Sequence, residues 1–173
     1  MKFFSGFSLK NEQHYFKDYI NSSQYCVCGF SYGAIKALSY TQEQLKLNRR
    51  IDTFQLFSPA FFQSKDEKFK KLQLIGYRKN RDKYLNEFLT SCFLPYEKKT
   101  VEQCENNIDE LEELLYYSWR VDELRELSNK GVSIEVYIGS EDKIIDADKA
   151  KDFFLEVATV TYIKNANHFL LTN

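Results

Sequence analysis

The feature that most constrains the fold is the stretch from Tyr25 to Leu38, where strand-forming residues lead into a glycine-flanked serine and then into a helix-forming run. The serine, Ser31, lies at the centre of Gly-Phe-Ser-Tyr-Gly at residues 29–33. A strand, a sharp turn and a helix with serine at the apex form the nucleophile-elbow pattern. A Cβ at Gly29 or Gly33 would collide with the neighbouring strand or helix. The stretch therefore predicts that the Ser31 hydroxyl projects above the edge of a sheet.

Strand and helix patterns alternate around this elbow, which predicts a parallel sheet. We expect strands at residues 2–4, 24–30, 52–57, 133–138 and 159–163, and helices at 11–20, 33–47 and 147–157. Residues 61–130 instead show four helical periodicities in succession, which predicts an insertion that folds over the active face. The alternation predicts the α/β class, and together with the nucleophile elbow at Ser31 we expect one domain over 1–173, a minimal α/β-hydrolase of about five mostly parallel strands. Its helical cap, at about 61–130, is inserted between the third and fourth strands.

Composition excludes several classes of protein. The chain has 173 residues, 43% of them hydrophobic and 28% charged, and its net charge of −1 gives no general attraction to nucleic acid or membrane. No apolar run approaches the ~20 residues that span a bilayer, and the N-terminus lacks the pattern of a secretory signal. The four cysteines have no metal-ligand spacing, so we expect reduced thiols, no metal and no cofactor. We expect a cytoplasmic protein.

A serine hydroxyl becomes a nucleophile when a base takes its proton, and histidine is the usual base. The chain has only two histidines. His14 lies in the first expected helix, where we expect a surface or packing role. His168 follows the last expected strand, at the same sheet edge as Ser31. His168 is therefore the candidate base.

An acid must orient the imidazole and stabilise its protonated form. Asp142 follows the preceding strand, and the order Ser31, Asp142, His168 is the order of an α/β-hydrolase. Glu141 and Asp146 are alternatives, but Glu141 should point away from Asp142, and Asp146 falls where a helix-capping residue is expected. We favour Asp142.

The intermediate of acyl transfer needs two donors for its oxyanion. The backbone N–H of Tyr32, next to the serine, is one by geometry. The backbone N–H of Phe7, in the turn after the first strand, is the natural second donor.

Charge is segregated along the insertion. Residues 65–83 carry eight basic and three acidic side chains, a balance of +5, whereas residues 102–126 carry nine acidic and two basic side chains, a balance of −7. Such runs are typical of solvated helix faces. The alternative is that the basic run binds an acidic partner.

Several motifs together resemble one family. They are Phe-Phe-Ser-Gly-Phe at 3–7, Gly-Phe-Ser-Tyr-Gly-Ala-Ile-Lys-Ala at 29–37, Phe-Ser-Pro at 57–59, Lys-Leu-Gln-Leu at 71–74, Lys-Gly-Val-Ser-Ile-Glu-Val-Tyr-Ile-Gly at 130–139 with Asp142, and Asn-His at 167–168. Together they resemble the small BioV-type pimeloyl-acyl-carrier-protein methyl ester esterases. The resemblance covers essentially the whole chain.

The resemblance implies hydrolysis of the methyl ester of pimeloyl-acyl-carrier protein, with release of methanol, in biotin biosynthesis. It also implies that Ser31 is the nucleophile, His168 the base and Asp142 the orienting acid, with Phe7 and Tyr32 as oxyanion donors. One departure is that serine precedes glycine in the oxyanion turn, where larger α/β-hydrolases usually have histidine. Since the donor there is backbone, we expect little consequence.

Such a substrate requires an apolar channel and a surface for the acidic carrier. We expect the channel to be lined by Phe61, Phe62, Tyr116, Tyr117 and Trp119. We expect the carrier to bind the basic run Lys65, Lys68, Lys70, Lys71, Arg78, Lys79 and Arg81. The alternatives are a general short-chain carboxylesterase or thioesterase and a non-catalytic binding protein with the same fold.

The short chain leaves one question about packing. Five strands joined in sequence by right-handed crossovers place their helices on one face of the sheet. We expect the other face to be covered by the cap, by the first helix or by a second subunit in a homodimer.

Overall fold

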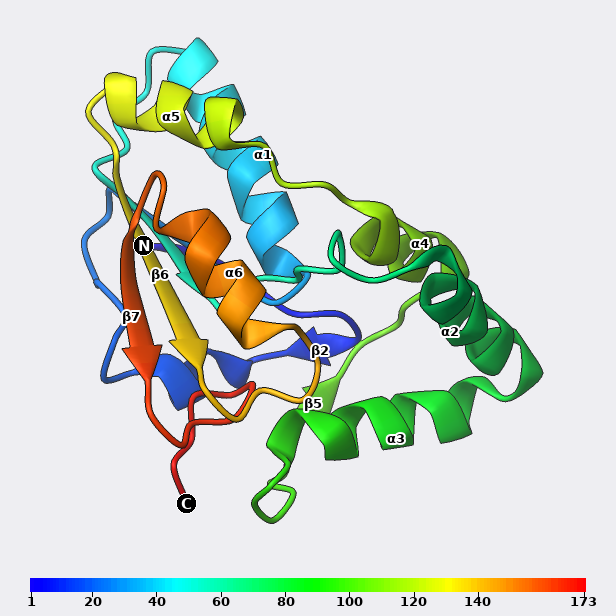
Figure 1. The fold of residues 1–173 in the computed structure, drawn as a ribbon. Coiled ribbons are helices and arrows are strands. Elements are labelled where there is room, and N and C mark those ends of the chain that lie inside the picture. The colour runs from blue at the N-terminus through cyan, green and yellow to red at the C-terminus, as the bar shows by residue number, and fades with distance from the viewer.

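The chain folds around a five-stranded sheet in which every neighbouring pair is parallel. The computed structural model describes all 173 residues. The strands lie in sequence order: β1 (Lys2–Phe4), β3 (Cys26–Phe30), β4 (Thr53–Phe57), β6 (Ser133–Gly139) and β7 (Thr159–Ile163) (Figure 1). The predicted α/β class and all five predicted strands are confirmed.

Three helices connect these strands and cover one face of the sheet. They are α1 (Gly33–Lys46), α5 (Val121–Asn129) and α6 (Ala147–Phe154) (Figure 1). Parallel neighbours need a crossover connection, and right-handed crossovers in strand order bring every helix to the same side. The larger core lies between these layers, with strand residues such as Leu56 and Val136 packed among Leu38, Leu124 and Phe154.

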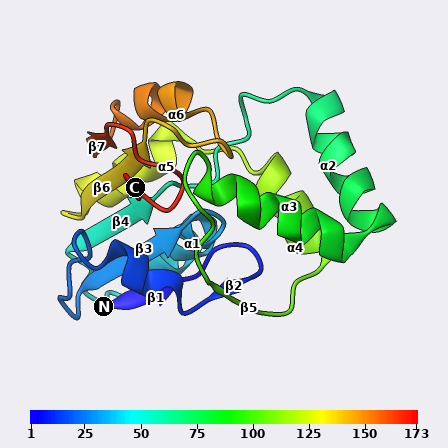
Figure 2. The ribbon, with the colours of Figure 1, turned by 90° about the horizontal axis from the view of Figure 1, so that it is seen from below.

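The cap forms a separate lobe of three helices, α2 (Glu67–Lys79), α3 (Arg81–Phe93) and α4 (Ile108–Tyr116) (Figures 1 and 2). Each begins at a side-chain cap: Asp66, Asn80 and Asn107 accept the backbone N–H three residues on. The fourth helix predicted within residues 61–130, α5, lies outside this lobe and packs against β6. It is the crossover helix that the parallel step from β4 to β6 requires. No helix is long and apolar enough to cross a membrane.

A two-stranded antiparallel ribbon that the sequence did not predict ties the cap to the N-terminal segment. Strand β2 (Leu9–Lys10) pairs with β5 (Glu102–Gln103), which lies between α3 and α4 (Figure 2). A strand of two residues is too short to show an alternation of polar and apolar residues, so the sequence gives no signal for it. The ribbon places a cap segment directly after the turn that contains Phe7.

The chain's own segments cover the second face of the sheet over β3 and β4. The predicted helix at 11–20 is instead a short 3-10 helix, η1 (Glu12–Phe16), which begins after a left-handed Asn11 at φ 61°. Phe16 is fully buried and stacks on Phe57, with ring centroids 4.8 Å apart. The end of α3 and the C-terminal segment, which contains Phe169, complete this smaller core. The first helix and the cap therefore both contribute to covering this face, as two of the three expectations stated.

We expect Phe16→Ala to lower the free energy of unfolding by about 3–5 kcal/mol, because it removes the ring that joins η1 to the sheet. Leu72→Ala is the control, since this side chain is 54% exposed and its loss should change stability by no more than about 0.5 kcal/mol. Urea unfolding followed by circular dichroism measures both. Equal midpoints for the two variants would contradict this role of η1.

Candidate active site

Ser31 lies in the tight turn between β3 and α1, and its backbone adopts a positive φ of 50°. Non-glycine residues hold such a conformation only where the surrounding structure fixes it. Two glycines let the backbone segments around this turn pack closely. A Cβ on Gly33 would lie 2.1 Å from the Phe4 carbonyl oxygen, and a Cβ on Gly29 would lie 2.5 Å from the Gly33 carbonyl oxygen. The predicted elbow is therefore present, and it directs the serine to the carboxyl edge of the sheet.

The structure brings Ser31, His168 and Asp142 together at that edge. His168 Nε2 lies 3.0 Å from Ser31 Oγ, and His168 Nδ1 lies 2.6 Å from Asp142 Oδ2. Because the carboxylate accepts from Nδ1–H, Nε2 is left free to accept the serine proton. All three residues are buried. They come from the ends of β3, β6 and β7, as their positions in the sequence predict.

Asp142, rather than either alternative acid, faces the histidine. Its Oδ1 accepts from the backbone N–H of Ile144 at 2.8 Å and of Ile145 at 3.2 Å, which leaves Oδ2 for His168. Glu141 pairs with Lys143 at the surface, 2.9 Å away. Asp146 caps α6, as the sequence predicts for it.

The loop that carries His168 is held by Asn167, a buried residue that received no separate role from the sequence. Its Nδ2 donates to the Phe93 carbonyl at 2.9 Å, and its Oδ1 accepts from Phe169 N at 3.0 Å and Leu171 N at 3.1 Å. The first bond attaches the loop to the end of α3, and the other two fix the loop's own conformation. The second histidine, His14, is exposed in η1 with its Nδ1 against the Asn11 carbonyl.

The backbone N–H groups of Phe7 and Tyr32 donate no hydrogen bond within the protein. Their rings pack edge to face, with centroids 6.4 Å apart, so the two residues lie side by side. Tyr32 directly precedes α1, where the positive end of the helix dipole favours negative charge. An oxyanion requires free donors of this kind, and the Tyr32 N–H directly follows Ser31 in the chain.

The side chain of Tyr32 reaches from the elbow to the cap. Its hydroxyl donates to the Glu113 carboxylate of α4, and burial together with this bond raises the pKa of Tyr32. One turn along α1, Lys36 pairs with Glu110 at 2.9 Å, and its Nζ lies 4.4 Å from the centroid of the Tyr32 ring. The cap helix α4 is therefore bonded to the start of α1.

A buried carboxyl that the sequence did not single out lies against the turn containing Phe7. Glu12 Oε1 accepts the Gly6 N–H at 2.8 Å, while Oε2 has no partner. Burial raises the pKa of Glu12. Nothing in the surrounding sequence, where Asn11 and Gln13 flank the glutamate, signals that this side chain is buried.

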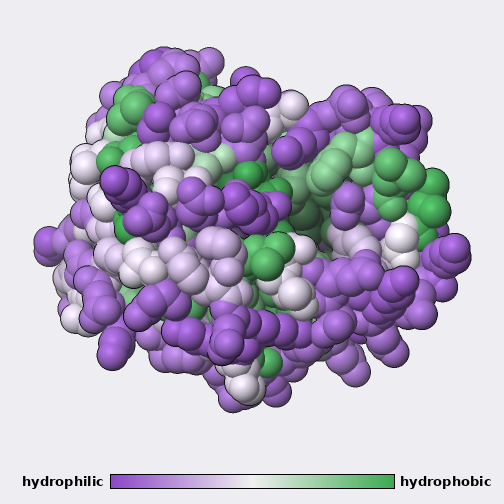
Figure 3. Space-filling view, turned by 60° about the horizontal axis from the view of Figure 1, so that its bottom comes forward, coloured by the Kyte–Doolittle hydropathy of each residue, from purple (hydrophilic) through white to green (hydrophobic).

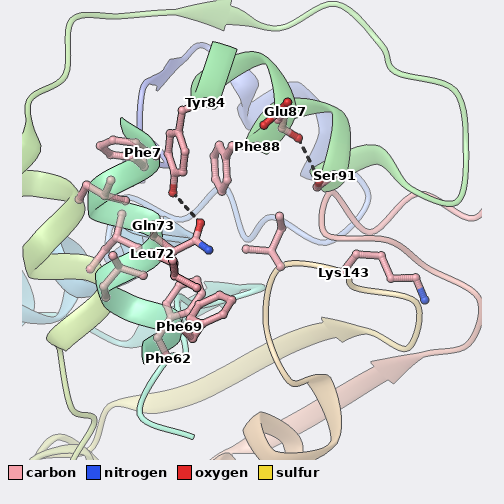
Figure 4. A pocket seen from close by; sticks show the side chains of 15 residues that line it. Phe7, Phe62, Phe69, Leu72, Gln73, Tyr84, Glu87, Phe88, Ser91 and Lys143 are labelled. Atoms are coloured by element: carbon pink, nitrogen blue, oxygen red, sulfur yellow. Dashed lines mark hydrogen bonds between the residues drawn. The ribbon is translucent and has the colours of Figure 1, made fainter. Parts of the chain in front are cut away.

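A cavity of about 400 Å³ lies between the cap and this edge of the sheet, and most of its lining is hydrophobic (Figure 4). Its wall includes Phe7 from the turn after β1 and Ile144 from the loop after Asp142, whereas Ser31, Asp142 and His168 are not among the lining residues. Helices α2 and α3 supply Phe69, Leu72 and Phe88. From outside, the surface is hollowed between the sheet and the cap, with hydrophobic residues along the cap side (Figure 3).

Of the five aromatic residues expected to line a channel, the structure places Phe62 in the cavity wall. Phe61 packs on Phe153 and Phe154 of α6, and Trp119 donates from Nε1 to the Ala60 carbonyl at 2.8 Å. Tyr117 packs edge to face on Trp119, and Tyr116 is partly exposed with its hydroxyl on Glu67. Phe61, Tyr117 and Trp119 therefore belong to the core, whereas Tyr116 lies at the surface between α4 and α2. Residues of α2, α3 and α4 line the cavity instead.

The seven basic residues expected to bind a carrier do not share one surface. Lys68, Lys71, Arg78, Lys79 and Arg81 are exposed on α2 and at the start of α3. Lys70 is only 8% exposed, with its Nζ 5.0 Å from the centroid of the Tyr116 ring. Lys65, which is half-buried, lies over Phe69. Lys70 is therefore outside the exposed basic surface, because helical spacing turns it toward α4.

No group of three or more histidine, cysteine, aspartate or glutamate side chains is arranged to hold a metal ion. Cys26 and Cys28 are buried with their Sγ atoms 3.5 Å apart, and no disulfide is formed.

Comparison with solved structures identifies the fold. The chain is similar to naproxen esterase from Bacillus subtilis, with 18% identity and a TM-score of 0.53 over 84% of this chain and 53% of that one. It is similar to the esterase EaEST from Exiguobacterium antarcticum, with 12% identity and a TM-score of 0.65 over 97% of this chain and 85% of that one. It is also similar to BioG from Haemophilus influenzae, with 10% identity and a TM-score of 0.56 over 97% of this chain and 87% of that one.

The chain thus spans about half the length of the naproxen esterase but most of the two others. No protein-family model matches the sequence, and no curated protein matches it. At these identities the similarity concerns the fold alone. The chain has a small α/β-hydrolase fold.

Replacing Glu12 by glutamine tests the buried carboxyl beside the oxyanion turn. Because the pKa of Glu12 is raised in the folded state, its ionisation opposes folding, and stability is lost as the pH rises through the folded pKa. We therefore expect the stability of Glu12→Gln relative to wild type to increase between pH 4 and pH 7.5. Thermal unfolding across this range measures it, with exposed Glu43→Gln as control. A difference that is independent of pH would contradict the assignment.

Proposed function

We propose that the chain is a serine esterase. The observation that carries the proposal is the buried hydrogen-bonded series from Ser31 through His168 to Asp142, beside two free backbone donors. These parts are the nucleophile, base, orienting acid and oxyanion donors of acyl transfer. A binding protein would have no need of such a buried series.

In the proposed reaction, Ser31 Oγ attacks the ester carbonyl carbon while His168 Nε2 takes the serine proton. Asp142 stabilises the imidazolium that forms, and the N–H groups of Phe7 and Tyr32 bind the negative oxygen of the tetrahedral intermediate. The carbon–oxygen bond to the alcohol then breaks, and His168 returns the proton to the leaving alcohol. Water, deprotonated by His168, hydrolyses the acyl-serine in the same way and releases the free acid.

We propose further that the substrate is the methyl ester of pimeloyl-acyl-carrier protein, with methanol as the released alcohol, as a step of biotin biosynthesis. The sequence resemblance supports this substrate. The cavity supports it as well, since a hydrophobic space of about 400 Å³ suits a flexible acyl chain. Release of the small methanol needs little space beyond Ser31, because the acyl chain occupies the cavity on the cap side.

The exposed side of α2 is the proposed docking surface for the carrier protein. Leu72 and Ile75 are 54% and 56% exposed there, and Lys68, Lys71 and Lys79 lie beside them at helical spacing. An exposed apolar centre with a basic rim suits an acidic partner. Leu72 also lines the cavity, so a carrier bound here would lie next to the opening through which its acyl chain enters.

The second candidate is a general short-chain carboxylesterase or thioesterase. The triad geometry and the hydrophobic cavity suit any acyl ester of moderate size. Neither feature selects the carrier-bound ester over other acyl esters, which favours this second candidate. Hydrolysis of the carrier-bound methyl ester and of its thioester, measured on the same preparation, distinguishes the two activities.

We expect the wild type to convert the purified methyl ester of pimeloyl-acyl-carrier protein to the free carboxylate, and Ser31→Ala to lose this activity by at least about 10³-fold. Intact-protein mass spectrometry before and after incubation detects the loss of the methyl group. A fluorophosphonate should label the wild type and leave Ser31→Ala unlabelled. An unlabelled wild type would favour a non-catalytic binding protein and contradict the proposal.

Charge reversal on α2 tests the docking surface. We expect Lys71→Glu combined with Lys79→Glu to raise KM for the carrier-bound ester on the order of tenfold and to leave a soluble methyl ester unaffected, because only the carrier presents acidic groups to this helix. The control pair, Lys17→Glu with Lys164→Glu, changes the charge equally at exposed sites outside the cap. Equal effects of the reversal on both esters would exclude docking at α2.

A further inference from the structure

The residue that follows Phe7 has an unusual backbone conformation. Ser8 has a φ of 62°, in the left-handed region that serine rarely adopts, and the residue is buried. The turn that contains Phe7 and Ser8 is closed by the Leu9 N–H, which donates to the Gly6 carbonyl at 3.1 Å. A turn that places a catalytic donor in a strained conformation needs partners that hold it there.

On one side the turn is held by Glu12 of η1, which accepts the Gly6 N–H at 2.8 Å, and on the other side its partners come from the cap. Beyond Ser8, strand β2 pairs only with β5 of the cap. The Cys104 N–H, one residue past β5, donates to the Ser8 carbonyl at 3.0 Å. Figure 1 shows β2 and β5 side by side, above α3 and below α4. The cap is therefore a structural support of the oxyanion turn.

Asn106 completes this support by joining Ser8 to two cap helices. Its Nδ2 donates to Ser8 Oγ at 2.7 Å. Its Oδ1 accepts from the hydroxyl of Tyr77 in α2 at 2.6 Å and from Arg81 Nε in α3 at 3.3 Å. One amide side chain thus connects the residue after the oxyanion donor with the two helices that line the cavity.

We propose that Asn106 is a positioning residue that sets the Phe7 N–H for the oxyanion and makes its position depend on the cap. The inference rests on the proposed esterase function. An oxyanion donor acts only when it lies about 2.7–3.1 Å from the developing charge, so a small displacement of the turn lowers the rate. Because Asn106 also bonds to Tyr77 of α2 and Arg81 of α3, the positions of α2 and α3 that let an acyl chain enter the cavity also fix the Phe7 N–H.

The first test compares Asn106→Ala with Asn107→Ala in the full chain, using hydrolysis of p-nitrophenyl butyrate. Losing an oxyanion donor outright costs about 10²- to 10³-fold in kcat, and we expect its displacement in Asn106→Ala to cost on the order of tenfold with KM little changed. Asn107 caps α4 and makes no hydrogen bond to Ser8. Asn107→Ala should therefore remove one cap hydrogen bond of α4 while the bond from Asn106 to Ser8 stays, and we expect kcat to be unchanged.

The second variant separates rate from stability. Glycine adopts a φ of 62° without strain, so Ser8→Gly should fold at least as stably as wild type while it removes the hydroxyl that Asn106 holds. We expect Ser8→Gly to lower kcat as much as Asn106→Ala. The double variant should show no further loss, because both changes break the same connection.

A trifluoromethyl ketone supplies a readout that a merely structural role would not change. Its serine adduct carries an oxyanion, so its inhibition constant should rise in Asn106→Ala by the factor by which kcat/KM falls. Suppose that the wild type is active but Asn106→Ala is no slower than Asn107→Ala, or that the ketone inhibits Asn106→Ala as well as it inhibits the wild type. Either result would overturn this inference and leave the proposed function standing. A wild type that neither hydrolyses the ester nor reacts with a fluorophosphonate would overturn the proposed function and the inference with it.

Discussion

The buried contact between Ser31 and His168 is the constraint on which the rest of the structure depends. It joins atoms separated by most of the chain, and it forms only if β3 and β7 end at the same edge of the sheet. A sheet of parallel strands in sequence order meets that condition, because all carboxyl ends then face one side. Asp142 enters from β6, between the other two strands, and completes the series without a further element.

The cap contributes to the site as well as covering it. It reaches the elbow through the Tyr32 hydroxyl on Glu113, and it reaches the histidine loop through the bond of Asn167 to the end of α3. Its ribbon with β2 supports the turn that contains Phe7, the proposed oxyanion donor. One lobe therefore makes contacts with the elbow, the histidine loop and the turn that contains Phe7.

The fold and the triad could be predicted from the sequence because each rests on a local pattern. Glycines around Ser31, alternation in the strands and a lone histidine after the last strand all lie within short windows. The lining of the cavity could not be predicted, since it depends on which turn of α2 and α3 faces inward, and both sides of these helices carry apolar residues. The roles of Glu12 and Asn106 depend on contacts between distant segments, which no local periodicity records.

The smaller core on the second face has a consequence for thermal inactivation of the protein. Phe169, the neighbour of His168, is buried in that core and stacks on Phe93 with ring centroids 4.4 Å apart. Melting of this layer would therefore release the proton acceptor of the site together with the aromatic rings around it. We therefore expect heat inactivation to coincide with the loss of packing in this core.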